Sequence, residues 1–399
     1  MIPRRRTPVD AASFVASYLA ARGDPAGAVG AFERAFAAYV GSRHAVASCS
    51  GRTAFVATLL ALGLTPGDEV LLPAYTLADI ATTIRSAGLV PVFADVDART
   101  LLLDASAVER AITPRTRAIV PTDIFGMAAP WDEALGDLAA RAGAVLVEDA
   151  AHAAGTRIDG APVGRRCRAA FFSLETIKVM HSFGGGVVVT DDADVAARVR
   201  ARLPKGSPPA SYLPLKFARN AVENVAFRTP AYGAALAAME LEPVRRAMLA
   251  TYDTMKSAGV LTSFAFEGWQ AAYASRQLDA LDARVDRRRA LAARLTGALD
   301  GLFEPQREPA RCRGNGYFAV GATRLAPRAL RRRLLALGVD VGIHHEITDF
   351  CPPESEAARF PNAWRAHERL VQLPLYDAMS DAEADRVARA VRRVLTDRG

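Results

Sequence analysis

The sequence contains few cysteines and no long apolar run, and these two absences exclude several classes of protein. Only four of its 399 residues are cysteine, and none lies in a CxxC pair or beside histidines at the spacing of metal ligands. Neither a disulfide framework nor a zinc site is therefore expected, and the predicted location is the reducing cytoplasm. No uncharged apolar stretch reaches about 18 residues, so an integral membrane span is not predicted. The basic N-terminus lacks the apolar segment of a secretory signal.

Glycine and proline are not in excess, and the composition is that of an ordered globular enzyme rather than a fibrous or disordered chain. Hydrophobic residues make up 51% and charged residues 23% of the sequence, whose length is sufficient for two packed domains. The net charge is +7, carried mainly by arginines on predicted helices. Such arginines usually form solvated helix faces, although they would also attract an anionic substrate. We find no nucleic-acid-binding motif, so no nucleic-acid partner is expected.

Helix-like and strand-like segments alternate between residues 28 and 190, which predicts a mainly parallel sheet with helices on both faces. The predicted strands span residues 69–73, 89–95, 117–122, 144–148, 169–174 and 185–190. The predicted helices between them span residues 51–64, 78–87, 105–112 and 131–142. Ligands of such sheets bind at the carboxyl ends of the strands, so functional residues are expected there.

The sequence after this region is less regular and then becomes helical again. Residues 203–259 contain six prolines, and one long helix is predicted over residues 267–299. The remaining segments predict strands over 317–320 and 339–343 and helices over 327–337 and 381–395. We therefore expect a large domain over residues 1–260, including an inserted helical stretch at about 203–259. Residues 261–399 are expected to form a linker helix and a smaller C-terminal α+β domain.

Two charged residues stand close to the ends of predicted strands. Asp149 ends the strand AVLVED, and Lys178 follows the strand AAFFSLE just before the glycines at 184–186. Taken singly, the carboxylate could cap a helix and the lysine could be an ordinary surface residue. A pyridoxal phosphate (PLP) site would use both residues. The carboxylate would keep the pyridine nitrogen protonated, and a desolvated lysine would be the nucleophile.

Three further residues fit such a site. His152 lies three positions after Asp149 and could bond the oxygen on the ring, although a lone histidine is more often a packed core residue. Ser173 could offer a hydroxyl to a phosphate. Gly51 opens a predicted helix after Ser-Cys-Ser, where a close backbone and free N–H groups favour an anion. Simple helix capping explains that last pattern equally well.

Several motifs in order along the chain resemble the DegT/DnrJ/StrS aminotransferase family, over nearly the whole sequence. The motifs are Ser50-Gly51-Arg52-Thr53-Ala54, Pro66-Gly67-Asp68-Glu69-Val70, Pro73-Ala74-Tyr75-Thr76, Glu148-Asp149-Ala150-Ala151-His152, Ser173-x4-Lys178 and Gly184-Gly185-Gly186. The resemblance implies the α/β fold type I of PLP-dependent transferases, with a seven-stranded sheet. It also implies a homodimer with active sites at the interface. The expected reaction moves an amino group from glutamate to a keto-sugar nucleotide.

The resemblance also implies roles for individual residues. Lys178 matches the Schiff-base lysine, Asp149 the partner of the pyridine nitrogen and His152 the residue near the ring oxygen. Ser173, Gly51 and Arg52 match phosphate-binding positions of the family motifs. Two departures stand out. Leu77 replaces the usual ring-stacking aromatic residue, for which Tyr75 is a candidate substitute. Ser263 begins the segment that reaches the neighbouring subunit's phosphate, where it could donate one hydrogen bond, but the usual arginine of that segment is replaced by Ala265.

Several alternatives remain open at this point. The apolar stretch over residues 215–242 predicts either a packed helical hairpin or a greasy surface for a lipid-linked substrate, with peripheral membrane contact. A PLP-dependent sugar dehydratase would carry histidine at the lysine position, and His181 lies close to Lys178. A non-catalytic PLP-binding protein is the third alternative. The keto acceptor is not identified by the sequence.

Overall fold

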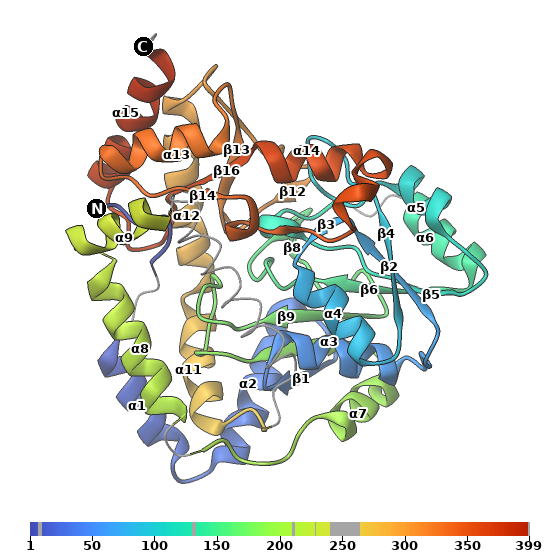
Figure 1. Ribbon diagram of the computed structural model, residues 1–399. Helices are drawn as coiled ribbons and strands as arrows, with labels where there is room; N and C mark the ends of the chain where they lie inside the picture. The colour runs from blue at the N-terminus through green and yellow to red at the C-terminus, as the bar shows by residue number, and fades with distance from the viewer. Residues whose placement is uncertain (7–9, 130–132, 210–211, 228, 240–263, 398–399) are drawn as a thin grey trace.

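A seven-stranded sheet forms the centre of the molecule (Figure 1). The computed structural model describes residues 1–6, 10–129, 133–209, 212–227, 229–239 and 264–397. The strands, in spatial order, are β1 (His44–Ser48), β10 (Gly186–Thr190), β9 (Ala169–Ser173), β6 (Val145–Asp149), β5 (Thr116–Ile119), β2 (Glu69–Pro73) and β4 (Val90–Ala94). Strand β10 is antiparallel to both of its neighbours, and the other four pairings are parallel. The predicted mainly parallel sheet is therefore confirmed.

Helices cover both faces of this sheet, because successive side chains of a strand point to opposite sides. In β10, Val188 packs on one face, whereas Val187 and Val189 pack on the other. The first face is covered by α3 (Gly51–Ala61), α4 (Ala78–Ser86) and α7 (Ala193–Arg202). The second face is covered by α2 (Pro25–Val40), α5 (Ala105–Ala111), α6 (Glu133–Ala142) and α11 (Gly268–Asp279). The β10 residues thus join two apolar layers.

A second, four-stranded antiparallel sheet lies in the C-terminal region. Its strands, in spatial order, are β11 (Phe303–Pro305), β13 (Ala319–Thr323), β16 (Leu370–Leu373) and β14 (Gly342–Ile343). Its separate core includes side chains of α12 (Leu281–Ala298), α13 (Pro327–Ala336) and α15 (Asp381–Thr396). Ile2 belongs to this core, and its backbone bonds those of Gly338 and Asp340 at 2.8 and 3.0 Å. The first residues of the chain therefore associate with the C-terminal region, whereas a domain boundary near residue 260 stays a prediction.

One expectation about the middle of the chain needs correction. The single helix expected over residues 267–299 is two helices, α11 and α12, because Ala280 leaves the helical conformation with φ −96° and ψ 0°. The break lets α11 pack on α2 while α12 packs on α15. The stretch expected to be helical at about 203–259 contains two helices in its described part, α8 (Tyr212–Ala226) and α9 (Pro230–Met239). Ser263 lies outside the described residues.

Helix α8 runs beside the N-terminal helix α1 (Ala11–Ala21) (Figure 1). The rings of Phe14 in α1 and Phe217 in α8 lie 4.3 Å apart, centroid to centroid. They meet Phe183 and Trp269 in a small aromatic cluster. Helix α8, which follows β10 in the chain, therefore packs against the turn at Phe183 that precedes β10. In the described part of the chain, every helix is too short or too polar to cross a bilayer.

The C-terminal region is joined to the central sheet at its carboxyl edge. Strand β15 (Asp349–Phe350) pairs with β3 (Tyr75–Thr76), which directly follows β2. The side-chain amide of Asn315 donates hydrogen bonds to the carbonyls of His152 and Ala154 at 2.7 and 2.9 Å. These contacts bring residues from both regions to the place where the sheet strands end.

Candidate active site

Asp149 is the last residue of β6, and its side chain is buried at the carboxyl edge of the sheet. One carboxylate oxygen accepts a hydrogen bond from the backbone N–H of Ala151 at 3.0 Å. The other lies 3.5 Å from the hydroxyl of Thr122. Burial raises the pKa of Asp149 to about 6, against the opposing effects of the Ala151 hydrogen bond and the Lys178 charge. Asp149 is therefore mostly ionised at neutral pH and interacts electrostatically with Lys178.

Lys178 lies on the connection between β9 and β10, and its side chain is also buried. Its ammonium nitrogen lies 5.2 Å from the centroid of the Tyr317 ring, within cation–π distance. Burial lowers the pKa of Lys178 to about 8, although the charges of Asp149 and Glu175 act in the opposite direction. A sizeable fraction of this amine is consequently neutral, and nucleophilic, near neutral pH.

His152 is held as a neutral imidazole beside these two residues. Its Nδ1 accepts a hydrogen bond from the backbone N–H of Phe125 at 3.2 Å, which leaves the ring proton on Nε2. Burial and the charge of Lys178 keep the pKa of His152 well below its usual value. The ring stacks on Tyr317, with centroids 4.4 Å apart and an interplanar angle of 22°. His152 therefore offers a fixed N–H donor through Nε2.

The N-terminus of α3 meets strand β9 at one end of the site. Ser50 caps the helix by accepting a hydrogen bond from the backbone N–H of Thr53 at 3.1 Å. A Cβ atom at Gly51 would lie 3.1 Å from Cβ and 3.3 Å from Oγ of Ser173, so glycine allows this close approach. The Ser173 hydroxyl and the first turn of α3 lie together here, and helix N-termini favour bound anions.

Comparison with known proteins agrees with this geometry. The profile of the DegT/DnrJ/EryC1/StrS aminotransferase family matches residues 25–392. The chain belongs to this family. It is therefore an aminotransferase, of a family whose enzymes depend on PLP.

Solved structures of family members superimpose on nearly the entire chain. DesI, determined in the presence of its TDP-sugar product, is 28% identical, with a TM-score of 0.76 over 99% of this chain and 93% of that chain. S. venezuelae DesV, in complex with a ketimine intermediate, is 27% identical, with a TM-score of 0.72 over 99% of this chain and 100% of that one. 3-Amino-5-hydroxybenzoic acid synthase is 26% identical, with a TM-score of 0.71 over 99% of both chains.

In this member of the DegT/DnrJ/EryC1/StrS family, Tyr75 and Leu77 pack in different surroundings. The Tyr75 ring is buried and lies edge-on to Phe125, with centroids 6.2 Å apart. Phe125 in turn stacks near His152 at 6.2 Å. Leu77 instead precedes α4 and packs, partly buried, in the core beneath α3 and α4. Tyr75 thus belongs to the aromatic contacts that lead through Phe125 to His152, whereas Leu77 packs in the apolar core.

Arg52, the other candidate in the first turn of α3, directs its guanidinium to α4. Its Nη1 forms an ion pair with Asp79 at 3.0 Å, and both side chains are about one-third exposed. The backbone of Arg52 remains beside Gly51, whereas its side chain lies against α4. The last candidate, Ser263, is outside the described residues.

Sequence reasoning missed two residues of the site. The ring of Tyr317 contacts both Lys178 and His152, whereas the sequence predicts this residue only as the start of a strand. Asn315 also accepts a hydrogen bond from the backbone N–H of Tyr317 at 2.9 Å, which fixes the tyrosine relative to His152. Both residues are more than 130 positions from Lys178 in sequence, and an Asn-Gly-Tyr segment has no local signal for such contacts.

His181, which lies close to Lys178 in sequence and so raised the dehydratase alternative, is a buried core residue. Its ring is buried edge-on to Phe183 at 5.4 Å and lies 5.6 Å from the Tyr273 ring. Burial lowers the pKa of His181 to about 3. Within the described residues, neither ring nitrogen has a hydrogen-bond partner. Such a weak base gives no support to a catalytic role.

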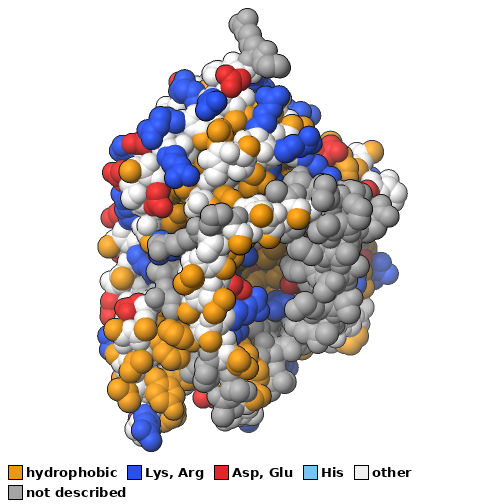
Figure 2. Space-filling view, turned by 60° about the vertical axis from the view of Figure 1, so that its left-hand side comes forward, with side chains coloured by type: hydrophobic (Ala, Val, Ile, Leu, Met, Phe, Trp, Pro, Cys, Tyr) orange, Lys and Arg blue, Asp and Glu red, His pale blue; other side chains and the backbone are white. Residues whose placement is uncertain are grey.

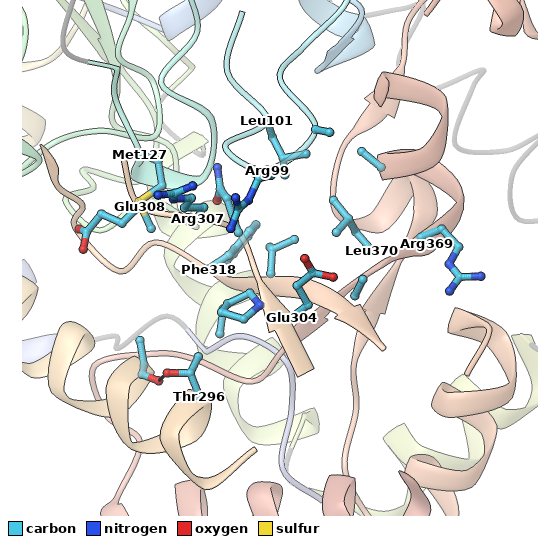
Figure 3. A pocket seen from close by; sticks show the side chains of 18 of the residues that line it. Arg99, Leu101, Met127, Thr296, Glu304, Arg307, Glu308, Phe318, Arg369 and Leu370 are labelled. Atoms are coloured by element: carbon cyan, nitrogen blue, oxygen red, sulfur yellow. Dashed lines mark hydrogen bonds between the residues drawn. The ribbon is translucent and has the colours of Figure 1, made fainter. Parts of the chain in front are cut away.

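A separate cavity of about 890 Å³ opens between the C-terminal sheet and the loops of the central sheet (Figure 3). Arginines and glutamates surround it, and its wall includes the ring of Phe318. The ring centroids of Phe318 and Tyr317 lie 4.1 Å apart. Because the Tyr317 ring contacts Lys178, these two neighbouring rings connect the cavity wall with the lysine site. Neither Lys178 nor Asp149 lines it.

Proposed function

We propose that this aminotransferase binds PLP through Lys178 and Asp149. In the proposed reaction, it moves an amino group from L-glutamate to the keto group of a nucleotide-activated sugar. The observation that carries the proposal is the buried pair itself. Lys178 has a pKa near 8 and Asp149 a pKa near 6, and each charge influences the other at the carboxyl edge of the sheet. A lysine nucleophile and a carboxylate partner in one buried site are what a PLP enzyme requires.

The groups at the two ends of the site support the fit to PLP. At one end, Gly51 lets the N-terminus of α3 approach the Ser173 hydroxyl closely. The N–H groups of the helix end and this hydroxyl together suit a phosphate. At the other end, Asp149 suits a protonated pyridine nitrogen. His152 lies three residues beyond it with a proton on Nε2, which suits an acceptor oxygen on the ring.

When bound, PLP supplies an electron-withdrawing ring that stabilises negative charge on the substrate carbon. Asp149 would hold the proton on the pyridine nitrogen by its negative charge. The free amine of Lys178 would take a proton from the substrate carbon and deliver it to the cofactor. The Tyr317 ring covers this amine and would limit access of water. Nε2 of His152 would donate a hydrogen bond to the ring oxygen.

The likeness to DesI supports a nucleotide-activated keto-sugar as the amino acceptor, because that structure holds a TDP-sugar product at 28% identity. The likeness to 3-amino-5-hydroxybenzoic acid synthase, at 26% identity, favours a second candidate, a keto substrate without a nucleotide. The exposed apolar residues of α8 extend this second candidate to lipid-linked acceptors. A screen of keto compounds against the amino-loaded enzyme distinguishes these acceptors.

The test of the proposal has two stages. Borohydride reduction of the purified enzyme, followed by peptide mass spectrometry, should find the cofactor on Lys178. L-Glutamate should then change the absorbance of the bound cofactor, and the correct keto acceptor should restore it. Lys178→Ala should lose both signals, whereas Lys205→Ala, at an exposed lysine, should keep both. Cofactor attachment at another lysine, or an absorbance that glutamate leaves unchanged, would contradict the proposal.

We further propose a cytoplasmic homodimer whose subunits complete one another's active sites. An exposed apolar surface supports a contact with another molecule: Val15, Tyr18 and Leu19 of α1, with Val222 and Val225 of α8, are each about half or more exposed. Figure 2 shows hydrophobic side chains gathered low on this face. Light scattering should give twice the chain mass. Sedimentation with lipid vesicles tests the alternative, a peripheral membrane contact.

A further inference from the structure

Helix α8 brings Lys216 against the turn that follows Lys178. The Lys216 ammonium donates a hydrogen bond to the carbonyl of Phe183 at 2.6 Å and lies 3.8 Å from a carboxylate oxygen of Glu175. A Cβ atom at Gly184 would lie 2.7 Å from this ammonium, and Gly184 has a φ of 121°. Glycine at this position therefore permits both the turn and the approach of Lys216.

Glu175 connects this lysine with the proposed cofactor site. The backbone N–H of Glu175 donates to the hydroxyl of Ser173 at 3.4 Å, so Glu175 lies at the end of the site proposed for the phosphate. Its carboxylate accepts hydrogen bonds from the backbone N–H and the hydroxyl of Thr176, both at 2.9 Å. Its charge also acts on Lys178. The Glu175 side chain is 48% exposed and the Lys216 side chain 26% exposed, so solvent and ligands can reach both. In Figure 2, acidic and basic side chains lie together at a hollow of the face that α8 borders.

The position of Glu175 raises an electrostatic problem for a phosphate ligand. A phosphate ester carries between one and two negative charges near neutral pH, with its second pKa at about 6. Charges within about 10 Å of one another interact before salt screens them. An unpaired Glu175 carboxylate would therefore repel a phosphate bound at Ser173 and Gly51. The ion pair with Lys216 removes that net charge.

We propose that Lys216 is a positioning residue that neutralises Glu175 and so allows the cofactor phosphate to bind beside Ser173. The inference rests on the proposed function, because it assumes that PLP binds there. Among the cations of the described residues, Lys216 has the larger electrostatic effect on Glu175 and Lys178 the smaller one. Lys178 is directed to the Tyr317 ring, and the guanidinium of Arg52 is paired with Asp79. Lys216 thus gives helix α8 a role in cofactor binding within its own chain.

The test compares PLP with pyridoxal, which lacks the phosphate, in binding to cofactor-free full-length protein by equilibrium dialysis. Lys216→Met should weaken PLP binding about tenfold and leave pyridoxal binding nearly unchanged. The reason is that the unpaired Glu175 carboxylate would repel the phosphate, which pyridoxal lacks. Glu175→Gln should not weaken PLP binding. The double variant should return to the wild-type ratio of PLP to pyridoxal affinity. Lys205→Met is the matched control.

Each other outcome has a defined meaning. Equal losses of PLP and pyridoxal in Lys216→Met would assign Lys216 only to bracing the Phe183 turn, and the inference would be wrong. Failure of Glu175→Gln to rescue Lys216→Met would also overturn it. Circular dichroism checks the fold. If Lys216→Met unfolds, Lys216→Gln compared with Lys216→Arg takes its place, and only the glutamine should lose PLP affinity. A wild-type protein that binds neither ligand would instead refute the proposed function.

Discussion

Replacing Lys178 with methionine should stabilise the cofactor-free protein, because the lysine is buried and only 8% exposed. Its pKa is near 8 instead of the ordinary 10.5. That difference corresponds to about 3 kcal/mol of lost free energy of unfolding wherever the amine is protonated in both states. The substitution also removes the positive charge that helps Asp149 to ionise. We therefore expect a net gain of about 1–3 kcal/mol at about pH 7 for Lys178→Met.

The sign of the pH dependence follows from which state binds the proton. Below pH 8 the amine is protonated in both the native and the unfolded state, and the native state bears the full cost of burying the charge. Between pH 8 and 10.5 the native amine loses its proton while the unfolded amine keeps it, so the wild type gains stability as the pH rises. The advantage of Lys178→Met should shrink across this window and vanish above it.

Urea unfolding of the two cofactor-free proteins, followed by tryptophan fluorescence between about pH 7 and about pH 10, measures this difference. Lys205→Met, at an exposed lysine, should match the wild type throughout. A Lys178→Met protein that is less stable than the wild type at neutral pH would refute the reasoning. So would a stability difference that stays constant as the pH rises, because the burial of a titrating amine could not then be its cause.

Four further substitutions test other parts of the site. Asp149→Asn should slow amino transfer at least about 100-fold in single-turnover kinetics with L-glutamate, since an amide cannot keep the pyridine nitrogen protonated. Gly51→Ala should weaken PLP binding about tenfold in equilibrium dialysis, because the added methyl group would press on β9. Asn315→Ala removes three buried hydrogen bonds and should lower the free energy of unfolding by about 2–4 kcal/mol in a urea titration. Tyr317→Ala should admit water and raise the pKa of Lys178, which would move the pH midpoint for covalent capture of pyridoxal upward.

Local patterns were sufficient to predict the parts of the fold that have a clear period or a strong end signal. Six strands of the central sheet were predicted near their observed positions, and Asp149 was predicted at a strand end, where β6 places it. Strand β1, with the sequence HAVAS, was not predicted, because five residues on one edge of a sheet show little periodicity. Strand β16 and helix α14 (Pro361–Arg369) were also not predicted; β16 has only four residues, too few to show a period.

Contacts between distant parts of the chain could not be predicted from local patterns. Alanine favours helices, so nothing in the sequence around Ala280 indicates that α11 and α12 separate there. The pairing of Arg52 with Asp79 and the approach of Lys216 to the turn at Phe183 also depend on tertiary packing. The family motifs predicted the two ends of the proposed site, whereas the contacts of Tyr317 and Asn315 are visible only in three dimensions.

One physical cause links the three titratable groups of the site. Burial disfavours the charged form of each, and it raises the pKa of Asp149 while lowering those of Lys178 and His152. Much of that burial comes from the C-terminal region, since Tyr317 lies over the lysine and stacks on the histidine, and Asn315 holds it there. A weakly basic amine, a neutral imidazole and a weakly acidic carboxyl group therefore depend on the contact between the two regions. Because one contact sets all three protonation states, a substitution that loosens it should shift them together rather than one at a time.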